Sequence, residues 1–283
     1  MRVLNNLQRW GVRRLGKERC RRIIRQLARL SEIDMLNFVH QEMGVMKYEN
    51  LKVSGEEHFI QKELPRLLSR QQPLLLDVGA NVGKFSSLLR AQFPAAEICA
   101  FEPVPSTFST LQENMRSLNV RCFGFGLGRQ EETVPIYRSA QEGFSSQASL
   151  YPEVASSMHR YEKVVSETIS LRTLDAVAAE QQWTTIDFLK IDTEGNEFSV
   201  LQGAEKLISD KRIGAIMFEF NEMNVASRVF LRDFYDLLAD YKFFRLDTER
   251  LISLGRYHTR NEIFQFHNLL AVPTTGSLAK EKM

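Results

Sequence analysis

The feature that most constrains this chain is a change in hydrophobic period near residue 73. From there on, short apolar runs of strand length alternate with longer stretches in which apolar residues recur at helical spacing. The strand-like runs lie at 74–76, 97–101, 120–125, 187–191 and 214–220, and the helical stretches at 84–92, 106–118, 197–209 and 226–241. This alternation predicts an α/β fold in which helices cover both faces of a parallel sheet.

The remaining segments complete this outline. Alternation at 167–171 predicts one more strand, and runs at 243–247, 251–254 and 269–272 are expected to close the sheet. Between 138 and 165 the chain mixes Ser, Gln, Gly and Tyr, which predicts a long loop over a site. We therefore expect a basic helical extension over 1–70, one sheet domain over 71–273 and a flexible tail over 274–283.

Length and composition exclude several classes of protein. The 283 residues contain no apolar run approaching the roughly 20 residues that a membrane-spanning helix needs. The three cysteines, Cys20, Cys99 and Cys122, form no CxxC pair, which excludes a disulfide framework and a thiolate zinc site. A reducing, cytoplasmic location fits this cysteine usage best.

The N-terminal segment is strongly basic. Residues 1–29 hold ten Lys or Arg residues against one acid, so the rest of the chain is net acidic. Apolar residues, among them Ile23, Ile24 and Leu27, recur there at helical spacing beside the arginines, which predicts an amphipathic helix. Three roles stay open: packing on its own domain or on a second subunit, contact with a membrane surface or another anionic ligand, and a mitochondrial presequence. The late first serine, Ser31, disfavours the presequence.

A glycine-containing turn follows the first predicted strand, at the sheet edge where doubly wound folds bind ligands. Residues 77–83 read DVGANVG, and Glu102 ends the second strand, where its carboxylate can accept hydrogen bonds from two ribose hydroxyls. A dinucleotide fingerprint would have GxGxxG, and an acid beside a diphosphate would be repulsive. Asp77 instead suits the sulfonium and ammonium of S-adenosylmethionine, so the turn favours this methyl donor over NAD.

The strand at 187–191 continues into a second group of charged residues. Because side chains alternate along a strand, Lys190, Asp192 and Glu194 are expected to share one face. In the usual strand order, Asp77, Asp192, Glu194 and Glu219 would surround one crevice, with Lys190 offsetting their charge. Two alternatives remain: Asp192 or Glu194 caps the next helix, or Asp192, Glu194 and Glu219 bind Mg²⁺ or Ca²⁺. A divalent metal is the less favoured of these predictions.

These motifs, taken together, resemble those of the FkbM family of S-adenosylmethionine-dependent methyltransferases. The resemblance extends over about 73–273. It is carried by DVGANVG (77–83), FEP (101–103), LG (127–128), TLD (173–175), LKIDTEGNE (189–197), VLQGA (200–204) and NLLAVP (268–273).

The resemblance implies a class I methyltransferase fold, Rossmann-like, with a seven-stranded, mainly parallel sheet whose last strand is reversed. By this resemblance, Glu102 binds the ribose of the donor and Leu127 borders its adenine. The methionine part of the donor is lined by Asp77, Gly79, Asn81 and Gly83. The segment 145–150 resembles the family's Ser-Leu element, which would involve Ser146 or Ser149.

The predicted activity is methylation of a hydroxyl on a sugar, polysaccharide, glycolipid or secondary metabolite. A hydroxyl is a poor nucleophile, so a base should assist it, and Asp192 and Glu194, with Lys190, are the predicted catalytic residues. His159 is a weaker candidate base. Two alternatives are an NAD-dependent dehydrogenase and a binding module without chemistry. Nucleic-acid methylation is disfavoured, because the sheet domain is net acidic.

Overall fold

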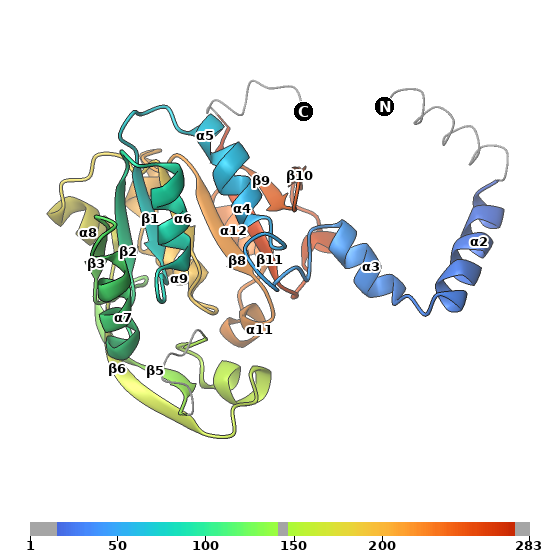
Figure 1. Ribbon diagram of the computed structural model, residues 1–283, viewed down its shortest axis with the longest axis horizontal. Coiled ribbons are helices and arrows are strands. Elements are labelled where there is room, and N and C mark those ends of the chain that lie inside the picture. Colours follow the sequence, from blue (N-terminus) through green and yellow to red (C-terminus); the bar gives the residue numbers. More distant parts are fainter. Residues whose placement is uncertain (1–15, 141–146, 275–283) are drawn as a thin grey trace.

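The computed structural model describes residues 16–140 and 147–274, and its centre is a twisted sheet of eight strands (Figure 1). The strands follow the spatial order β10-β9-β11-β8-β7-β1-β2-β3. Their bounds are β1 Leu74–Val78, β2 Glu97–Phe101, β3 Arg121–Phe123, β7 Phe188–Ile191, β8 Ile216–Phe220, β9 Tyr241–Leu246, β10 Leu251–Ser253 and β11 His267–Pro273. The strand β11 runs antiparallel to both neighbours, which confirms the mainly parallel sheet with a reversed last strand. The expected count of seven is exceeded by the short edge strand β10, which pairs antiparallel with β9.

Helices cover both faces of this sheet, and the alternation along its strands explains why. In β1, Leu76 belongs to one buried apolar cluster with Leu189 and Phe218, whereas the adjacent Leu75 belongs to another with Phe188. Both faces are buried, so apolar residues stand on both faces of the central strands. The covering helices are α6 Lys84–Gln92, α7 Pro105–Met115, α8 Leu174–Glu180, α9 Glu197–Gln202, α10 Glu205–Ser209, α11 Met223–Ser227 and α12 Leu231–Leu237.

A second, three-stranded sheet of order β4-β6-β5 was only partly predicted. It comprises β4 Gly126–Leu127, β5 Glu132–Ser139 and β6 Val164–Arg172, and a short π-helix, η2 Val154–Met158, lies within the predicted loop. The strand β5 escaped prediction because its sequence, ETVPIYRS, is half exposed and interrupted by Pro135. As the edge strand of this sheet, β5 tolerates a proline that a central strand would not.

The N-terminal segment divides into two parts. The helices α2 Lys17–Leu30 and α3 Met35–Glu42 project from the body in Figure 1. In contrast, α4 Glu56–His58, η1 Phe59–Glu63 and α5 Leu64–Leu67 pack on the sheet, and Phe59, Ile60 and Leu64 are buried in its core. The predicted division at residue 70 is therefore not visible as a break in packing. The predicted tail lies outside the described residues from position 275 on.

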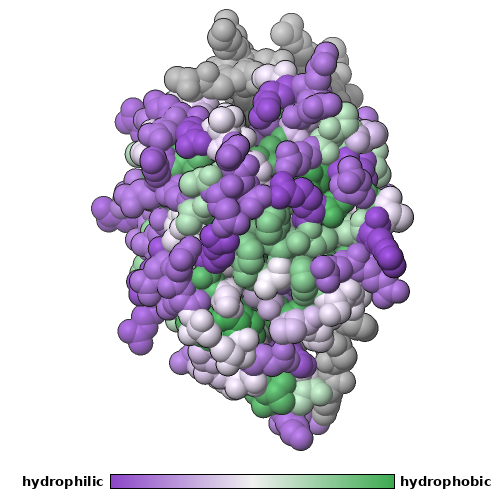
Figure 2. All heavy atoms as spheres, turned by 90° about the vertical axis from the view of Figure 1, so that its left-hand side faces the viewer, coloured by the Kyte–Doolittle hydropathy of each residue, from purple (hydrophilic) through white to green (hydrophobic). Residues whose placement is uncertain are grey.

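The sheet edge formed by β3 is closed by mixed polar and apolar side chains. Figure 2 shows this side of the molecule as mostly hydrophilic, with apolar side chains gathered near its middle. The guanidinium of Arg121 lies over the ring of Phe123 (5.4 Å), and that of Arg172 over Phe125 (5.2 Å). Such arginines cover half-buried aromatic rings while their charges stay in water.

No helix in the described part of the chain has the length and apolar character needed to cross a membrane.

Candidate active site

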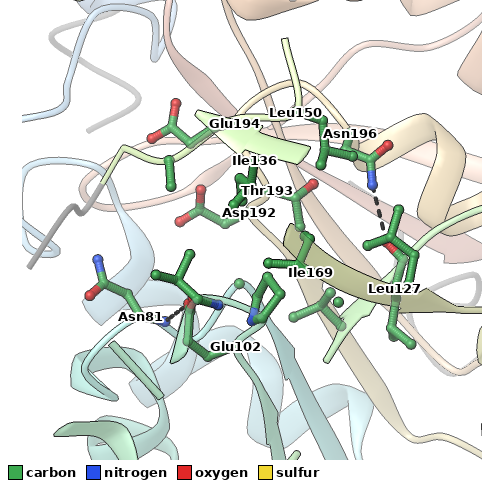
Figure 3. A pocket seen from close by; sticks show the side chains of 17 residues that line it. Asn81, Glu102, Leu127, Ile136, Leu150, Ile169, Asp192, Thr193, Glu194 and Asn196 are labelled. Carbon is green, nitrogen blue, oxygen red and sulfur yellow. Dashed lines mark hydrogen bonds between the residues drawn. The ribbon is translucent and has the colours of Figure 1, made fainter. Parts of the chain in front are cut away.

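A pocket of about 660 Å³ opens at the carboxyl ends of β1, β2 and β7, where doubly wound sheets bind ligands. Figure 3 shows the acidic side chains and Asn81 on one side of it, and Leu127 with the amide of Asn196 on the other. The acidic side includes Glu102, Asp192 and Glu194, and the aliphatic side is formed by Val104, Leu127, Ile136, Ile169 and Leu171. The small second sheet supplies most of the aliphatic wall.

The glycine turn after β1 is fixed by its neighbours in the fold. Gly79 has a φ of +78°, and a Cβ at this position would lie 1.7 Å from the backbone oxygen of Asp192. Only glycine therefore lets β1 and the end of β7 approach this closely. Gly79 and Asn81 both line the pocket, as predicted for donor-binding residues. Gly83 does not line it: a Cβ there would meet the side chain of Met115 at 2.6 Å, so Gly83 serves the packing of α7.

Glu102 is held at the pocket by two backbone amides. Its Oε2 accepts a hydrogen bond from Asn81 N (3.0 Å) and its Oε1 accepts one from Val104 N (2.9 Å). Each oxygen keeps a further lone pair, so the carboxylate can still accept two hydroxyl groups of a ligand. Burial raises the pKa of Glu102 to about 7, against the opposite effect of the two backbone hydrogen bonds.

The predicted adenine contact, Leu127, lies in the aliphatic wall and is 1% exposed. Its backbone oxygen accepts a hydrogen bond from Asn196 Nδ2 (3.0 Å), drawn in Figure 3, which ties β4 to the segment after β7. An apolar wall beside a hydroxyl-binding carboxylate suits a flat aromatic base joined to a sugar.

Asp77 does not line this pocket. Its side chain is fully buried, its Oδ2 accepts a hydrogen bond from Ser86 Oγ (2.7 Å), and its Oδ1 lies 3.6 Å from Lys190 Nζ. In the structure the carboxylate therefore faces a lysine of the neighbouring strand. Its predicted contact with the donor stays a prediction.

Lys190 connects the two carboxylates that flank it. Its Nζ donates to Asp192 Oδ2 (3.0 Å) and lies 5.0 Å from the ring centre of Phe85. Burial by itself would lower the pKa of Lys190, but the carboxylates of Asp192, Asp77 and Glu56 outweigh it and raise that pKa. Lys190 is therefore a permanent cation beside Asp192, as the sequence predicted.

The acids expected around one crevice are instead divided between two cavities. A second cavity, of about 1160 Å³, shares Gly79, Asn81 and Asp192 with the first and is lined in addition by Glu56, Lys190 and Glu219. Burial raises the pKa of Glu56 and, well above its ordinary value, that of Glu219, whose nearest acidic influences are Asp192 and Glu194. Asp192 thus stands where the two cavities meet.

Glu194 belongs to the first cavity only. The strand β7 ends at Ile191, so alternation does not extend to Glu194, which has a φ of +54° and lies with its Oε2 3.8 Å from His159 Nε2. Burial raises the pKa of Glu194, and the neighbouring imidazole of His159 acts in the opposite direction. Ser149 Oγ donates to the backbone oxygen of Glu194 (2.7 Å), which gives the predicted Ser-Leu element a positioning role. The other candidate, Ser146, lies outside the described residues.

The left-handed turn at Glu194 is held by Glu197. Its Oε1 accepts hydrogen bonds from the backbone N–H groups of Thr193 (2.8 Å) and Gly195 (3.2 Å). A non-glycine residue with positive φ is strained and persists where its surroundings fix it. The sequence indicated Glu197 only as part of the family motif and did not indicate Glu56, because no local pattern connects residue 56 with Lys190 and Asp192, which follow it by more than 130 residues.

The metal alternative finds no matching ligand set. No cluster of three or more His, Cys, Asp or Glu side chains is arranged to hold a metal ion in residues 16–140 and 147–274. Asp192 is engaged by Lys190, and Glu219 accepts a hydrogen bond from Asn221 Nδ2 (3.1 Å). The three acids proposed as ligands therefore point to different partners.

Comparison with known proteins gives a consistent assignment. A family model described as "Methyltransferase FkbM domain" matches residues 77–244. Methyltransferase 1 of Beauveria bassiana is 27% identical over 185 residues, which is 60% of this chain and 68% of that protein. The 2-O-methyltransferase NoeI of Sinorhizobium fredii is 23% identical over 65% of this chain and 78% of its own length. Hexuronic acid methyltransferase AglP of Haloferax volcanii is 28% identical over 53% and 56%, respectively.

Among solved structures, the O-methyltransferase from Bacillus cereus in complex with SAH covers 77% of this chain and 80% of its own, with 15% identity and a TM-score of 0.41. The strand order and the reversed β11 define the fold here independently of that likeness.

Proposed function

Because the chain belongs to the FkbM methyltransferase family and is an S-adenosylmethionine-dependent methyltransferase, we propose that it methylates a hydroxyl group of a small molecule or glycan. The chemical class of the acceptor is suggested by two relatives, whose names specify a 2-O-methyltransferase and a hexuronic acid methyltransferase. Both names point to oxygen as the methylated atom or to a sugar as the acceptor.

The first cavity is the proposed donor site. Glu102 would accept the hydrogen bonds of the two ribose hydroxyls, and the aliphatic wall that includes Leu127 and Ile169 would contact the adenine. The residues fit this group because Glu102 retains free lone pairs while both its oxygens are already oriented by backbone amides. Bound there, the donor supplies an electrophilic methyl group.

The second cavity is the proposed acceptor site. It shares the lining residues Gly79, Asn81 and Asp192 with the first cavity, so an acceptor bound there would lie next to the donor site. Its wall includes Tyr48 and Glu56, which precede the residues matched by the family model. The acceptor would thus be selected in part by side chains from outside the residues that the family model matches.

Asp192 is the proposed general base. It lines both cavities, and its Oδ2 accepts a hydrogen bond from Lys190 Nζ (3.0 Å). It would accept the proton of the acceptor hydroxyl as the oxygen attacks, a step that typically contributes 10²–10⁴-fold, on the order of a few kcal/mol. Glu194 lines the first cavity, and its Oε2 lies 3.8 Å from His159 Nε2. The two side chains together would orient the part of the substrate that faces this cavity.

The observation that carries this proposal is the Glu102 carboxylate, oriented by two amides beside an aliphatic wall at the sheet edge. Titration calorimetry with S-adenosylhomocysteine and with NADH tests it. We expect micromolar binding of S-adenosylhomocysteine and none of NADH. Tight NADH binding with no response to S-adenosylhomocysteine would establish the dehydrogenase alternative instead.

The test for oxygen as the target uses labelled S-adenosylmethionine with a panel of monosaccharides, uronic acids and amines. Label in an ether product supports the proposal, whereas label only on amines contradicts it.

We also propose a cytoplasmic location, supported by Cys20, Cys99 and Cys122 being free thiols.

A further inference from the structure

The helix α2 has two chemically opposite faces. At 3.6 residues per turn, its apolar residues fall on one side and its arginines on the other. The apolar side comprises Cys20, Ile23, Ile24, Leu27 and Leu30, and the arginines are Arg19, Arg21, Arg22, Arg25 and Arg29. A single acid, Glu18, pairs with Arg21 (2.8 Å), so four of these arginines have no acidic partner on their own helix.

The apolar face of α2 is not covered by the other residues that the structure describes. Ile24 is 52% exposed, Leu27 59% and Leu30 83%, and Figure 1 shows α2 standing away from the sheet domain. The exposed apolar surface continues through α3, where Leu36 is 67% exposed. A folded domain rarely leaves such a contiguous apolar surface in water, so this one indicates an interaction site.

We propose that α2 lies in the headgroup boundary of an anionic lipid surface. Its apolar face would enter the edge of the acyl region, and its arginines would bind lipid phosphates. Arginine on one face with leucine and isoleucine on the other is the pattern of interfacial helices. The charge favours lipid over a second copy of this chain, because pairing two α2 helices would bring ten arginines together.

Vesicle sedimentation of the full chain tests this proposal. We expect binding to phosphatidylcholine vesicles that contain about 30 mol % phosphatidylserine, and at least about tenfold weaker binding to phosphatidylcholine alone. Raising the salt from about 0.1 M to about 0.5 M should weaken the binding by a similar factor. Replacing Arg22 and Arg25 together by glutamine should weaken it about tenfold or more, because each arginine near an anionic surface adds about 1 kcal/mol.

Two single variants with the same change of charge separate insertion from surface attraction. Leu27→Glu places a carboxylate on the apolar face and should lower vesicle binding about tenfold or more, whereas Gln26→Glu alters the polar side and should stay within about threefold. Both should keep the wild-type affinity for S-adenosylhomocysteine, which shows that the sheet domain is intact.

Three results would overturn the proposal. The first is a wild-type chain that does not sediment with phosphatidylserine vesicles. The second is equal binding by Leu27→Glu and Gln26→Glu, which would leave only surface charge. The third is a dimer in light scattering that Leu27→Glu dissociates while vesicles stay unbound, which would make a second copy the occupant of this face.

Discussion

The two cavities that meet at Asp192 are built in different ways. The first cavity, the proposed donor site, is formed by backbone amides and a carboxylate at the carboxyl ends of β1, β2 and β7 and by an aliphatic wall that comes mostly from the second sheet. The second cavity, the proposed acceptor site, is lined by charged side chains from segments far apart in sequence. These are the cation Lys190 and the acids Glu56, Asp192 and Glu219. A fixed donor can be recognised by fixed backbone geometry, whereas a variable acceptor requires side chains that can change without altering the sheet.

Glycine in the donor turn provides the largest expected effect. Gly79→Ala should destabilise the protein by about 4 kcal/mol or more, because its Cβ would overlap the backbone oxygen of Asp192. Gly255→Ala is a matched control: its φ is also positive (+64°), but nothing lies within 4 Å of its Cβ, so only about 1–2 kcal/mol of backbone strain is expected. Denaturant unfolding measures both. Equal losses would mean that the turn does not constrain the approach of the strands.

The second largest effect is expected from replacing Lys190, the cation of the second cavity. Lys190→Met leaves the buried Asp77 without its cation and should cost about 3 kcal/mol of unfolding free energy. Lys206→Met, on an exposed position of α10, should change stability by less than about 0.5 kcal/mol. Denaturant unfolding at neutral pH compares them. A loss below about 1 kcal/mol for Lys190→Met would show that the buried Asp77 does not depend on this lysine.

Asp192→Asn tests the junction of the cavities. The amide keeps the shape of the side chain but cannot accept a proton, so turnover should fall about a hundredfold. The affinity for S-adenosylhomocysteine should stay within about threefold, and Asp210→Asn, on an exposed turn, should leave both unchanged. Single-turnover methyl transfer measures the effect. If unfolding midpoints drop while the turnover of folded protein is kept, Asp192 has a structural role only.

Glu102→Gln provides the smallest effect and tests the donor cavity. One backbone amide would then face an NH₂ group, so the dissociation constant for S-adenosylhomocysteine should rise about tenfold, while Glu113→Gln on the surface of α7 should not change it. The pKa of Glu102 is raised to about 7, and the ionised form accepts hydroxyls, so wild-type affinity should weaken as the pH falls from 8 to 6, up to about tenfold.

The titration of Glu102 changes the stability of the protein in the opposite direction to its effect on donor affinity. The folded state holds the Glu102 proton more tightly than the unfolded chain, so at this group the free energy of unfolding falls as the pH rises from 4.5 to about 7. Glu102→Gln should flatten both profiles. An unchanged pH dependence of binding in the variant would assign the titration to another group.

The family resemblance implied the reversed last strand, whereas the sequence by itself determined the alternation of strands and helices, the glycine turn and the carboxylate at position 102. These features follow from local apolar periods and from motifs contained within a few residues, where covalent geometry limits the outcome. It also identified Lys190 beside Asp192, since both belong to one strand and its end.

Only the tertiary structure decided how the acids were distributed. It turned Asp77 toward Lys190 and Ser86, placed Glu194 beside His159, and brought Glu56 to the cavity from a segment that no motif marked. It also placed η2 within the predicted loop and formed β5 over 132–139, mostly before that loop, where the sequence predicted no strand. The positions of the acidic side chains depend on the partners that offset their buried charges. Those partners are set by burial and by distance in the folded chain, not by local sequence.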